Sequence, residues 1–130
     1  MKAKQAWIDA AVKASEKAYI PYSHFPVGAC LVTEDEELIT GCNIENASFG
    51  LTNCAERTAI FKAISEGKKA FKHLVVYGKT KQPISPCGAC RQVMSEFFDS
   101  ATPVTLVAED LSVKEMTVGE LLPYSFEDLN

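Results

Sequence analysis

The sequence predicts an α/β protein with three layers, α/β/α, in which helices cover both faces of a mixed five-stranded sheet. One observation behind this is a pair of short apolar segments joined by a polar loop, which indicates a hairpin of two strands. The other is that helical and strand patterns alternate after this hairpin. The chain has 130 residues, the length of one domain, so we expect a single domain over 1–130.

The first helix is predicted from apolar residues that recur at spacings of three and four within 7–19, and it ends before Pro21. Two strands follow at 27–32 and 38–44, and the polar residues 33–37 separate them. A connection this short suits a hairpin, so we expect these strands to be antiparallel neighbours.

The rest of the chain alternates between helix and strand. The helix that begins at Ala55 is apolar over most of its surface, which predicts burial, and Gly67 ends it. The connection 109–112 is too short for a parallel crossover, so the fifth strand should run antiparallel to the fourth. The predicted elements are a helix at 55–66, a strand at 71–78, a helix at 87–98, strands at 104–108 and 113–118, and a helical turn at 119–123.

Composition limits the partners that we expect. The net charge of −4 argues against DNA or RNA, because binding to them requires cations that neutralise phosphates. No segment has the ~18 apolar residues of a membrane span, and charges such as Asp9 and Lys13 interrupt any signal peptide. The five cysteines, an odd number, favour metal binding or catalysis in a reducing compartment. We expect a cytoplasmic protein with a small substrate and no membrane partner.

Two cysteine segments carry the clearest chemical signal. Cys54 precedes one predicted helix, and Cys87 and Cys90 begin another. Helix N-termini lower thiol pKa values, and cysteine binds zinc as the thiolate. Three protein ligands leave one position of a tetrahedral zinc open for water, which is typical of catalytic zinc and not of structural zinc. The sequence therefore predicts one Zn²⁺ in a catalytic site.

Glu56 is the candidate catalytic residue. It lies two positions after Cys54, which is about 200° further round a helix, so its carboxylate need not bind the metal. A carboxylate beside metal-activated water acts as a general acid and base, a role that typically contributes about 10²- to 10⁴-fold in rate.

Two arginines adjoin the predicted metal site. Three thiolates around Zn²⁺ carry a net negative charge, so nearby cations are needed to keep the metal a good Lewis acid. Arg57 follows Glu56, and Arg91 follows Cys90. Either could donate to a ligand sulfur, and the alternative for each is a solvated surface charge.

Other interpretations compete with this one. A Cys-x-x-Cys pair alone also fits a redox dithiol or a structural metal site. Cys30 and Cys42 lie in predicted strands, where small buried thiols are common. We expect His24 and His73 on the surface or at a strand edge, and not among the metal ligands.

Three segments together closely resemble cytidine deaminases of the small-subunit, homotetrameric kind. They are Asn-Ile-Glu-Asn at 43–46, Cys-Ala-Glu-Arg-Thr-Ala at 54–59, and Ser-Pro-Cys-Gly-Ala-Cys-Arg-Gln-Val at 85–93. The zinc deaminase signature is His-x-Glu followed by Pro-Cys-x-x-Cys, and this chain has its three-cysteine version. The resemblance covers nearly the whole chain, from Pro21 to Phe126.

The resemblance implies hydrolytic deamination of free cytidine and deoxycytidine to uridine and deoxyuridine, in pyrimidine salvage. Cys54, Cys87 and Cys90 would hold one Zn²⁺ per subunit. Zinc-bound hydroxide would attack C4 of the ring, while Glu56 would pass a proton to N3 and then to the departing amine.

The resemblance also implies the substrate contacts. Phe25 would stack on the base, and the Ala55 backbone N–H would meet the base carbonyl. Asn43 and Glu45 would hydrogen-bond the ribose hydroxyls. These two residues are two apart on a strand, so their side chains share one face, which is compatible with holding a diol.

In the implied homotetramer, neighbouring subunits complete each site. Phe126 would reach into a neighbour's site. Phe49 occupies a position where the family often has Tyr, whose hydroxyl can help to hold the 5′ end of the sugar across a subunit boundary. Because Phe lacks that hydroxyl, the 5′-hydroxyl contact would pass to the backbone of Ala47 or to water.

Three other functions are weighed against this one. A deaminase of a nucleoside antibiotic or modified nucleoside is disfavoured by 43–46, which suits an unblocked ribose. A deaminase acting on nucleic acid is disfavoured by the acidic charge and by the lack of a basic tract. A noncatalytic zinc module or a dithiol redox protein is disfavoured because neither function would need the carboxylate of Glu56.

Overall fold

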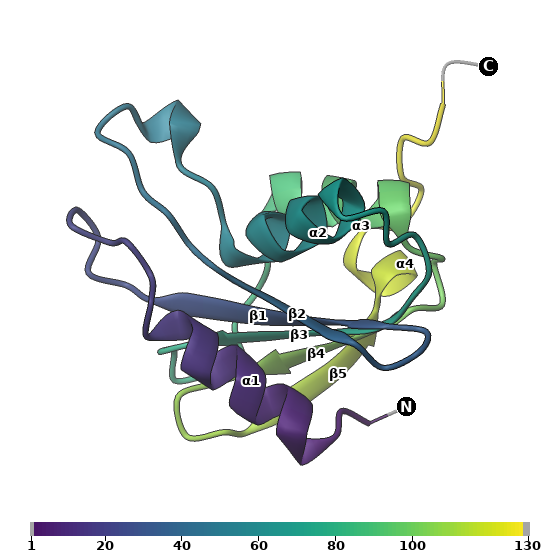
Figure 1. Cartoon of the computed structure of the whole chain (residues 1–130), viewed down its shortest axis with the longest axis horizontal. Coiled ribbons are helices and arrows are strands. Elements are labelled where there is room, and N and C mark those ends of the chain that lie inside the picture. Colours follow the sequence, from purple (N-terminus) through teal and green to yellow (C-terminus); the bar gives the residue numbers. More distant parts are fainter. Residues whose placement is uncertain (1, 129–130) are drawn as a thin grey trace.

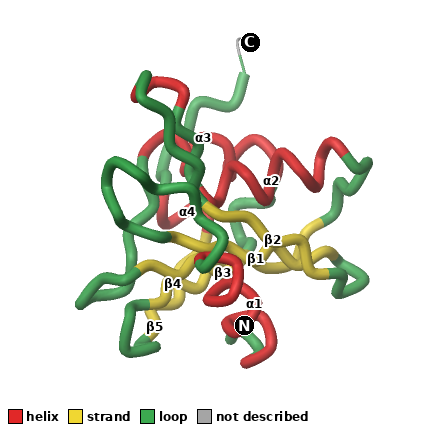
Figure 2. The backbone as a smooth tube through the Cα atoms, turned by 60° about the vertical axis from the view of Figure 1, so that its left-hand side comes forward, coloured by secondary structure: helices red, strands yellow, loops and turns green. Residues whose placement is uncertain are grey.

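The computed structural model describes residues 2–128 of the chain. A five-stranded sheet forms the middle layer, with α1 on one face and α2 and α3 on the other (Figures 1 and 2), which confirms the predicted α/β/α architecture. The elements are α1 (Gln5–Ser15), β1 (Val27–Thr33), β2 (Leu38–Cys42), a 3₁₀ turn η1 (Phe49–Leu51), α2 (Ala55–Ser65), β3 (Phe71–Gly78), α3 (Gly88–Phe97), β4 (Pro103–Val107), β5 (Val113–Thr117) and α4 (Val118–Leu121). Between residues 2 and 128, every helix is too short or too polar to span a lipid bilayer.

The strands lie in the order β2-β1-β3-β4-β5. β1 is antiparallel to both β2 and β3, β3 is parallel to β4, and β5 is antiparallel to β4. The mixed sheet, the first hairpin and the antiparallel fifth strand are therefore confirmed. The predicted strand at 38–44 ends earlier, at Cys42, because Ile44 pairs with Asn53 instead.

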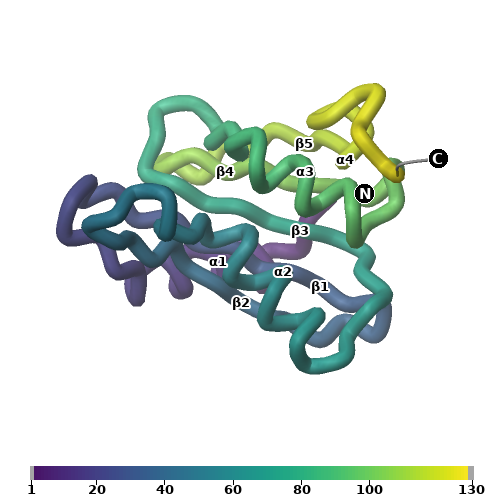
Figure 3. The backbone as a smooth tube through the Cα atoms, turned by 90° about the horizontal axis from the view of Figure 1, so that it is seen from above, coloured from purple at the N-terminus to yellow at the C-terminus, as the bar shows by residue number. Residues whose placement is uncertain are grey.

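The topology brings two helix N-termini to the same end of the sheet. Because β2 and β3 both oppose β1, they point in the same direction. α2 follows β2, α3 follows β3, and both helices return across the same face, where they lie side by side (Figure 3). Each helix therefore begins near the carboxyl end of the strand that precedes it.

A glycine in β2 sets how closely α2 approaches the sheet. A Cβ at Gly41 would lie 2.5 Å from the backbone nitrogen of Ala59 and 2.8 Å from the backbone oxygen of Ala55. Both are backbone atoms of α2, so they could not move aside without moving the helix. Any side chain at Gly41 would therefore push α2 outward, together with the cysteine at its start.

His73 is the clearest departure from expectation. We expected it on the surface or at a strand edge, but its side chain is fully buried in β3. Its ring packs against Trp7 of α1, with ring centroids 5.1 Å apart, and its Nε2 lies 2.7 Å from Thr105 Oγ1. Thr105 in turn donates to Glu115 Oε2 at 2.6 Å. Burial lowers the pKa of His73 to about 4, partly opposed by the charge of Glu115.

We predict that His73 makes the folded state less stable in acid. Between pH 6.5 and about 4, His73 is protonated in the unfolded state but stays neutral in the folded state. The free energy of unfolding therefore falls as pH falls. The maximal slope is about 1.4 kcal/mol per pH unit. Urea unfolding at pH 7 and pH 5 should show a smaller loss for His73→Gln than for the natural protein. Equal losses would contradict the prediction, since all other titrating groups are common to both proteins.

Candidate metal centre

Three cysteine sulfurs meet where α2 and α3 begin. Cys54 is the N-cap of α2, Cys87 is the N-cap of α3, and Cys90 lies in the first turn of α3. Their sulfurs all lie within 4.8 Å of one another, and those of Cys54 and Cys87 are 3.7 Å apart. Two sulfurs bound at about 2.3 Å to a tetrahedral zinc are about 3.8 Å apart. The cluster therefore has the spacing of a zinc–thiolate site.

The charges of the cluster also fit a divalent cation. A hydrogen bond from Cys90, with help from Arg57, lowers the pKa of Cys54 to about 5 against the opposing effect of burial. The same hydrogen bond to Cys54, together with burial, raises the pKa of Cys90 well above its usual range. The thiols therefore do not all ionise by themselves. A metal cation at their centre supplies the positive charge with which three thiolates can coexist.

Glu56 lies beside the cluster without belonging to it. Among the described residues, the group of possible ligands around this point consists of the three cysteines, and the Glu56 carboxylate is not one of them. Glu56 is in the first turn of α2 and only 4% exposed. Burial raises its pKa to about 7. Cys54 and Cys90 both act on this pKa, so the carboxyl group lies next to the three-cysteine cluster, and a group so placed and shielded from bulk water suits proton transfer.

The two arginines take different places. Arg57 donates from Nη2 to Cys54 Sγ at 3.4 Å, so it lies where it can offset thiolate charge. Its Nε is buried and has no hydrogen-bond partner within residues 2–128. The guanidinium of Arg91 donates instead to oxygen atoms of three other residues. Of the two arginines that the sequence suggested for contact with sulfur, the structure brings only Arg57 to it.

Asn43 and Glu45 lie on a segment that runs beside the start of α2. Ile44, between them, exchanges two backbone hydrogen bonds of 2.9 Å with Asn53, the residue before Cys54. This pairing brings the two predicted ribose ligands to the neighbourhood of the metal cluster. Cys42, at the end of β2, is half-buried, and Cys30 is buried in β1. Neither belongs to the cluster of possible metal ligands.

Both polar side chains hold the loop that carries Phe25. Asn43 accepts from the Val27 N–H at 2.9 Å and donates to the Phe25 carbonyl at 2.8 Å. Glu45 accepts from the backbone N–H groups of residues 22 and 23, each at 3.1 Å, and from the Ser23 hydroxyl. The Ser23 hydroxyl lowers the pKa of Glu45, so this carboxylate stays ionised. Sequence reasoning missed this role of Ser23, although the segment that contains it is part of the resemblance.

The remaining predicted substrate contacts lie either at the buried start of α2 or on segments outside the core. Ala55 is buried at the first position of α2, where a backbone N–H has no acceptor within the helix. Ala47 and Phe49 lie on the loop around η1 that extends away from the sheet (Figure 1), and Phe49 is 77% exposed. Phe126 is on the C-terminal tail and is 64% exposed. Within one chain, the aromatic rings at 49 and 126 are thus largely in solvent.

Comparisons with known proteins agree with this geometry. A family model described as the cytidine and deoxycytidylate deaminase zinc-binding region matches residues 1–106. The chain is 53% identical to a cytidine deaminase of Halalkalibacterium halodurans, over 98% of each chain. It is 54% identical to a cytidine deaminase of Sporosarcina psychrophila, over 91% of this chain and 88% of that one. A crystal structure of cytidine deaminase from Burkholderia pseudomallei matches with a TM-score of 0.93 and 50% identity, over 96% of this chain and 100% of that one.

We predict that each chain binds one zinc ion and that the three clustered cysteines alone hold it. Cys54→Ala should lower zinc affinity by more than the roughly 10- to 100-fold typical of losing an outer hydrogen-bond partner, because it removes a ligand. Cys42→Ala is the matched control and should retain zinc fully. The measurement is zinc per chain by mass spectrometry after equilibration with increasing chelator. Full zinc retention by Cys54→Ala, or equal loss from the control, would contradict the assignment.

Proposed function

Since the chain belongs to the family of zinc-binding cytidine and deoxycytidylate deaminases, we propose that it hydrolyses free cytidine and deoxycytidine to uridine and deoxyuridine. The observation that carries this proposal is a cluster of three cysteine sulfurs with a buried carboxylate beside it that is not one of the ligands. The reaction consumes one water, forms a C4–O bond, breaks the C4–N bond and releases ammonia.

Glu56 moves the protons of this reaction. When bound by Cys54, Cys87 and Cys90, zinc supplies a Lewis acid and lowers the pKa of the attacking water to about 7. Glu56 accepts a proton from that water, delivers it to N3 of the ring, and then protonates the amine that leaves C4. Its burial excludes bulk water, so the proton is passed between fixed partners.

Arg57 offsets the negative charge of the thiolates. Its hydrogen bond to Cys54 Sγ withdraws electron density from that ligand, which leaves the metal a stronger Lewis acid. The N-termini of α2 and α3 act in the same direction, because their backbone N–H groups carry partial positive charge.

The nucleoside is held by the segments that adjoin the cluster. We assign base stacking to Phe25, the ribose hydroxyls to Asn43 and Glu45, and the base carbonyl to the Ala55 N–H. The hydrogen bonds of Asn43 and Glu45 to 22–27 support this assignment, because they tie the ribose ligands to the loop that carries the stacking ring. Sugar and base would then be recognised by one connected unit.

Neighbouring subunits of a homotetramer complete the site in this proposal. Phe126 reaches into a neighbour's site, and Phe49 and the Ala47 backbone lie near the 5′ end of the sugar. The exposure of both rings supports this, since within one chain each ring is free to contact a neighbouring subunit.

We further propose that the substrate is a free nucleoside, handled in the cytoplasm in pyrimidine salvage. The net charge of −4 supports a nucleoside over a nucleic acid, because polyanion binding depends on neutralising phosphates. It likewise gives no reason to expect attraction to an anionic membrane surface.

The direct test is uridine formation from cytidine by the zinc-loaded protein, with metal content measured on the same sample. The natural protein should deaminate cytidine. Glu56→Gln has nearly the same size and should keep zinc and fold, yet lose at least about 10²-fold in kcat because it cannot carry a proton. No deamination by a zinc-replete natural protein would refute the function. If kcat of Glu56→Gln is close to that of the natural protein, Glu56 does not transfer the protons of the reaction.

The role of Phe126 across subunits is tested by mixing two defective variants. Phe126→Ala should form an intact tetramer with reduced activity, and Tyr124→Ala, at another exposed aromatic of the same tail, is the control. Tetramers mixed from Phe126→Ala and Glu56→Gln subunits should be more active than the two parents summed. Some of their sites combine a natural Glu56 with a neighbour's natural Phe126. Unchanged KM and kcat in Phe126→Ala, or no gain on mixing, would refute the role.

A further inference from the structure

Arg91 hydrogen-bonds the turn at 85–90, which supplies two of the three cysteines. Its Nε donates to the carbonyl of Pro86 and its Nη2 to the hydroxyl of Ser85, both at 2.8 Å. Cys87, the residue after Pro86, is exposed, as are the next two residues. Pro86 and Cys90 on either side of these residues are buried, but Cys87 itself is not, so hydrogen bonds have a large share in fixing where the Cys87 sulfur lies.

The same guanidinium reaches the C-terminal part of the chain. Its Nη1 donates at 2.8 Å to the carbonyl of Leu121, the last residue of α4. Carbonyl groups in the last turn of a helix lack N–H donors within the helix, so Arg91 supplies a donor to one of them. The next residue, Gln92, donates from Nε2 to the carbonyl of Phe126 at 2.9 Å. Two consecutive residues of α3 thus hold both ends of 121–126.

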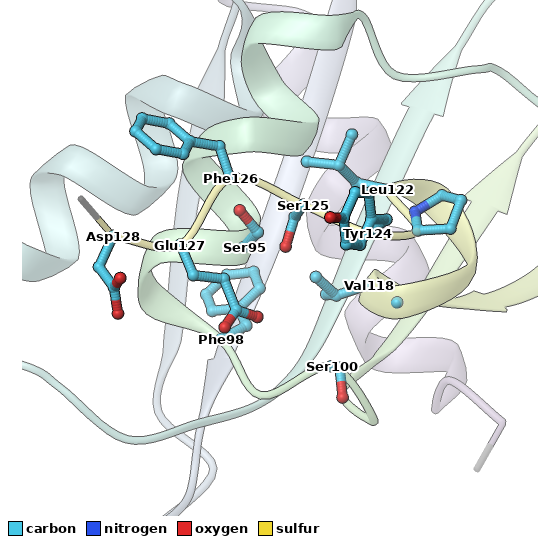
Figure 4. Close-up of a pocket in the computed structure, with 12 residues that line it drawn as sticks. Ser95, Phe98, Ser100, Val118, Leu122, Tyr124, Ser125, Phe126, Glu127 and Asp128 are labelled. Carbon is cyan, nitrogen blue, oxygen red and sulfur yellow. The ribbon is translucent and has the colours of Figure 1, made fainter. Parts of the chain in front are cut away.

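Packing alone does not determine the position of this tail. A cavity of about 640 Å³ lies between the tail and the helices beneath it, with Ser95, Phe98 and Leu122 among its lining residues (Figure 4). Phe126 also projects largely into solvent. Leu121 is buried in the core, but 122–126 lies over this cavity, so the position of 122–126 depends largely on the hydrogen bonds at Leu121 and Phe126.

We propose that Arg91 is a positioning residue that joins the metal-binding turn to the C-terminal segment 121–126. Arg91 then helps to place both Cys87 and Leu121, from which the segment that carries Phe126 continues. Arginine suits this role because its planar guanidinium presents donors in fixed directions to several acceptors at once, which lysine cannot do. The link to Phe126 rests on the proposed function, whereas the link to the metal turn does not.

The test compares zinc-loaded variants in the absence of substrate. Arg91→Gln should release zinc to a competing chelator at least about 10-fold faster than the natural protein. The backbone amide of Leu122, which donates to the Val118 carbonyl at the end of α4, should also exchange hydrogen faster, as followed by mass spectrometry. Gln92→Ala is the matched control: it frees only the Phe126 end, so it should leave both zinc release and amide exchange at Leu122 unchanged.

Kinetics then distinguish this inference from the deaminase proposal. In zinc-saturated Arg91→Gln, KM for cytidine should rise more than kcat falls, because Phe126 is displaced while Glu56 is intact. Arg91→Lys keeps the charge and should give intermediate values in all measurements, and it serves if Arg91→Gln does not fold. If both Arg91 variants release zinc, or exchange amide hydrogen, at the same rate as the natural protein, the inference is wrong, even if cytidine is deaminated. If cytidine is not deaminated, zinc release and exchange still decide it.

Discussion

The site depends on one topological constraint, the parallel direction of β2 and β3. Each strand is followed by a helix on the same face of the sheet, so two helix N-termini meet at one end. Cys54 caps one helix and Cys87 caps the other, which brings their sulfurs to 3.7 Å. The close approach of α2 to Gly41 fixes the depth of one of these helices. Without the parallel arrangement, Cys54 and Cys87, which are 33 positions apart, would not lie close enough to bind one metal ion.

Charge explains why the residues around the sulfurs are of these types. Thiolates that lie this close repel one another. The partial positive charge of two helix N-termini and the charge of Arg57, which donates to Cys54, reduce this repulsion. The same burial that makes an added charge costly raises the pKa of Glu56. The carboxylate therefore lies next to the metal position and is also able to exist in its protonated form. Both properties follow from its being the second residue of a buried helix.

Much of the fold could be predicted, because helical and strand periodicity and short connections are local. The strand at 71–78 has the predicted bounds, and the short connection at 109–112 correctly indicated the direction of β5. The orientation of His73 could not be predicted, since a strand buried on both faces has no alternating pattern to mark its two sides. Of the site, the cysteines and Glu56 form recognisable motifs. One of the three acceptors of Arg91 is the backbone oxygen of Leu121, 30 residues away, which no residue pattern marks.

In the proposed centre, three cysteines bind one zinc ion and leave its fourth position to water, with Glu56 outside the metal's coordination shell. X-ray absorption at the zinc edge tests this most directly on the natural protein without substrate. We expect three sulfur neighbours at about 2.3 Å and one oxygen at about 2.0 Å, with that oxygen retained in Glu56→Gln. Four sulfur neighbours would indicate a closed structural site. An oxygen that disappears in Glu56→Gln would show that the carboxylate itself binds the metal. Either result would rule out a three-cysteine zinc with Glu56 outside its coordination shell.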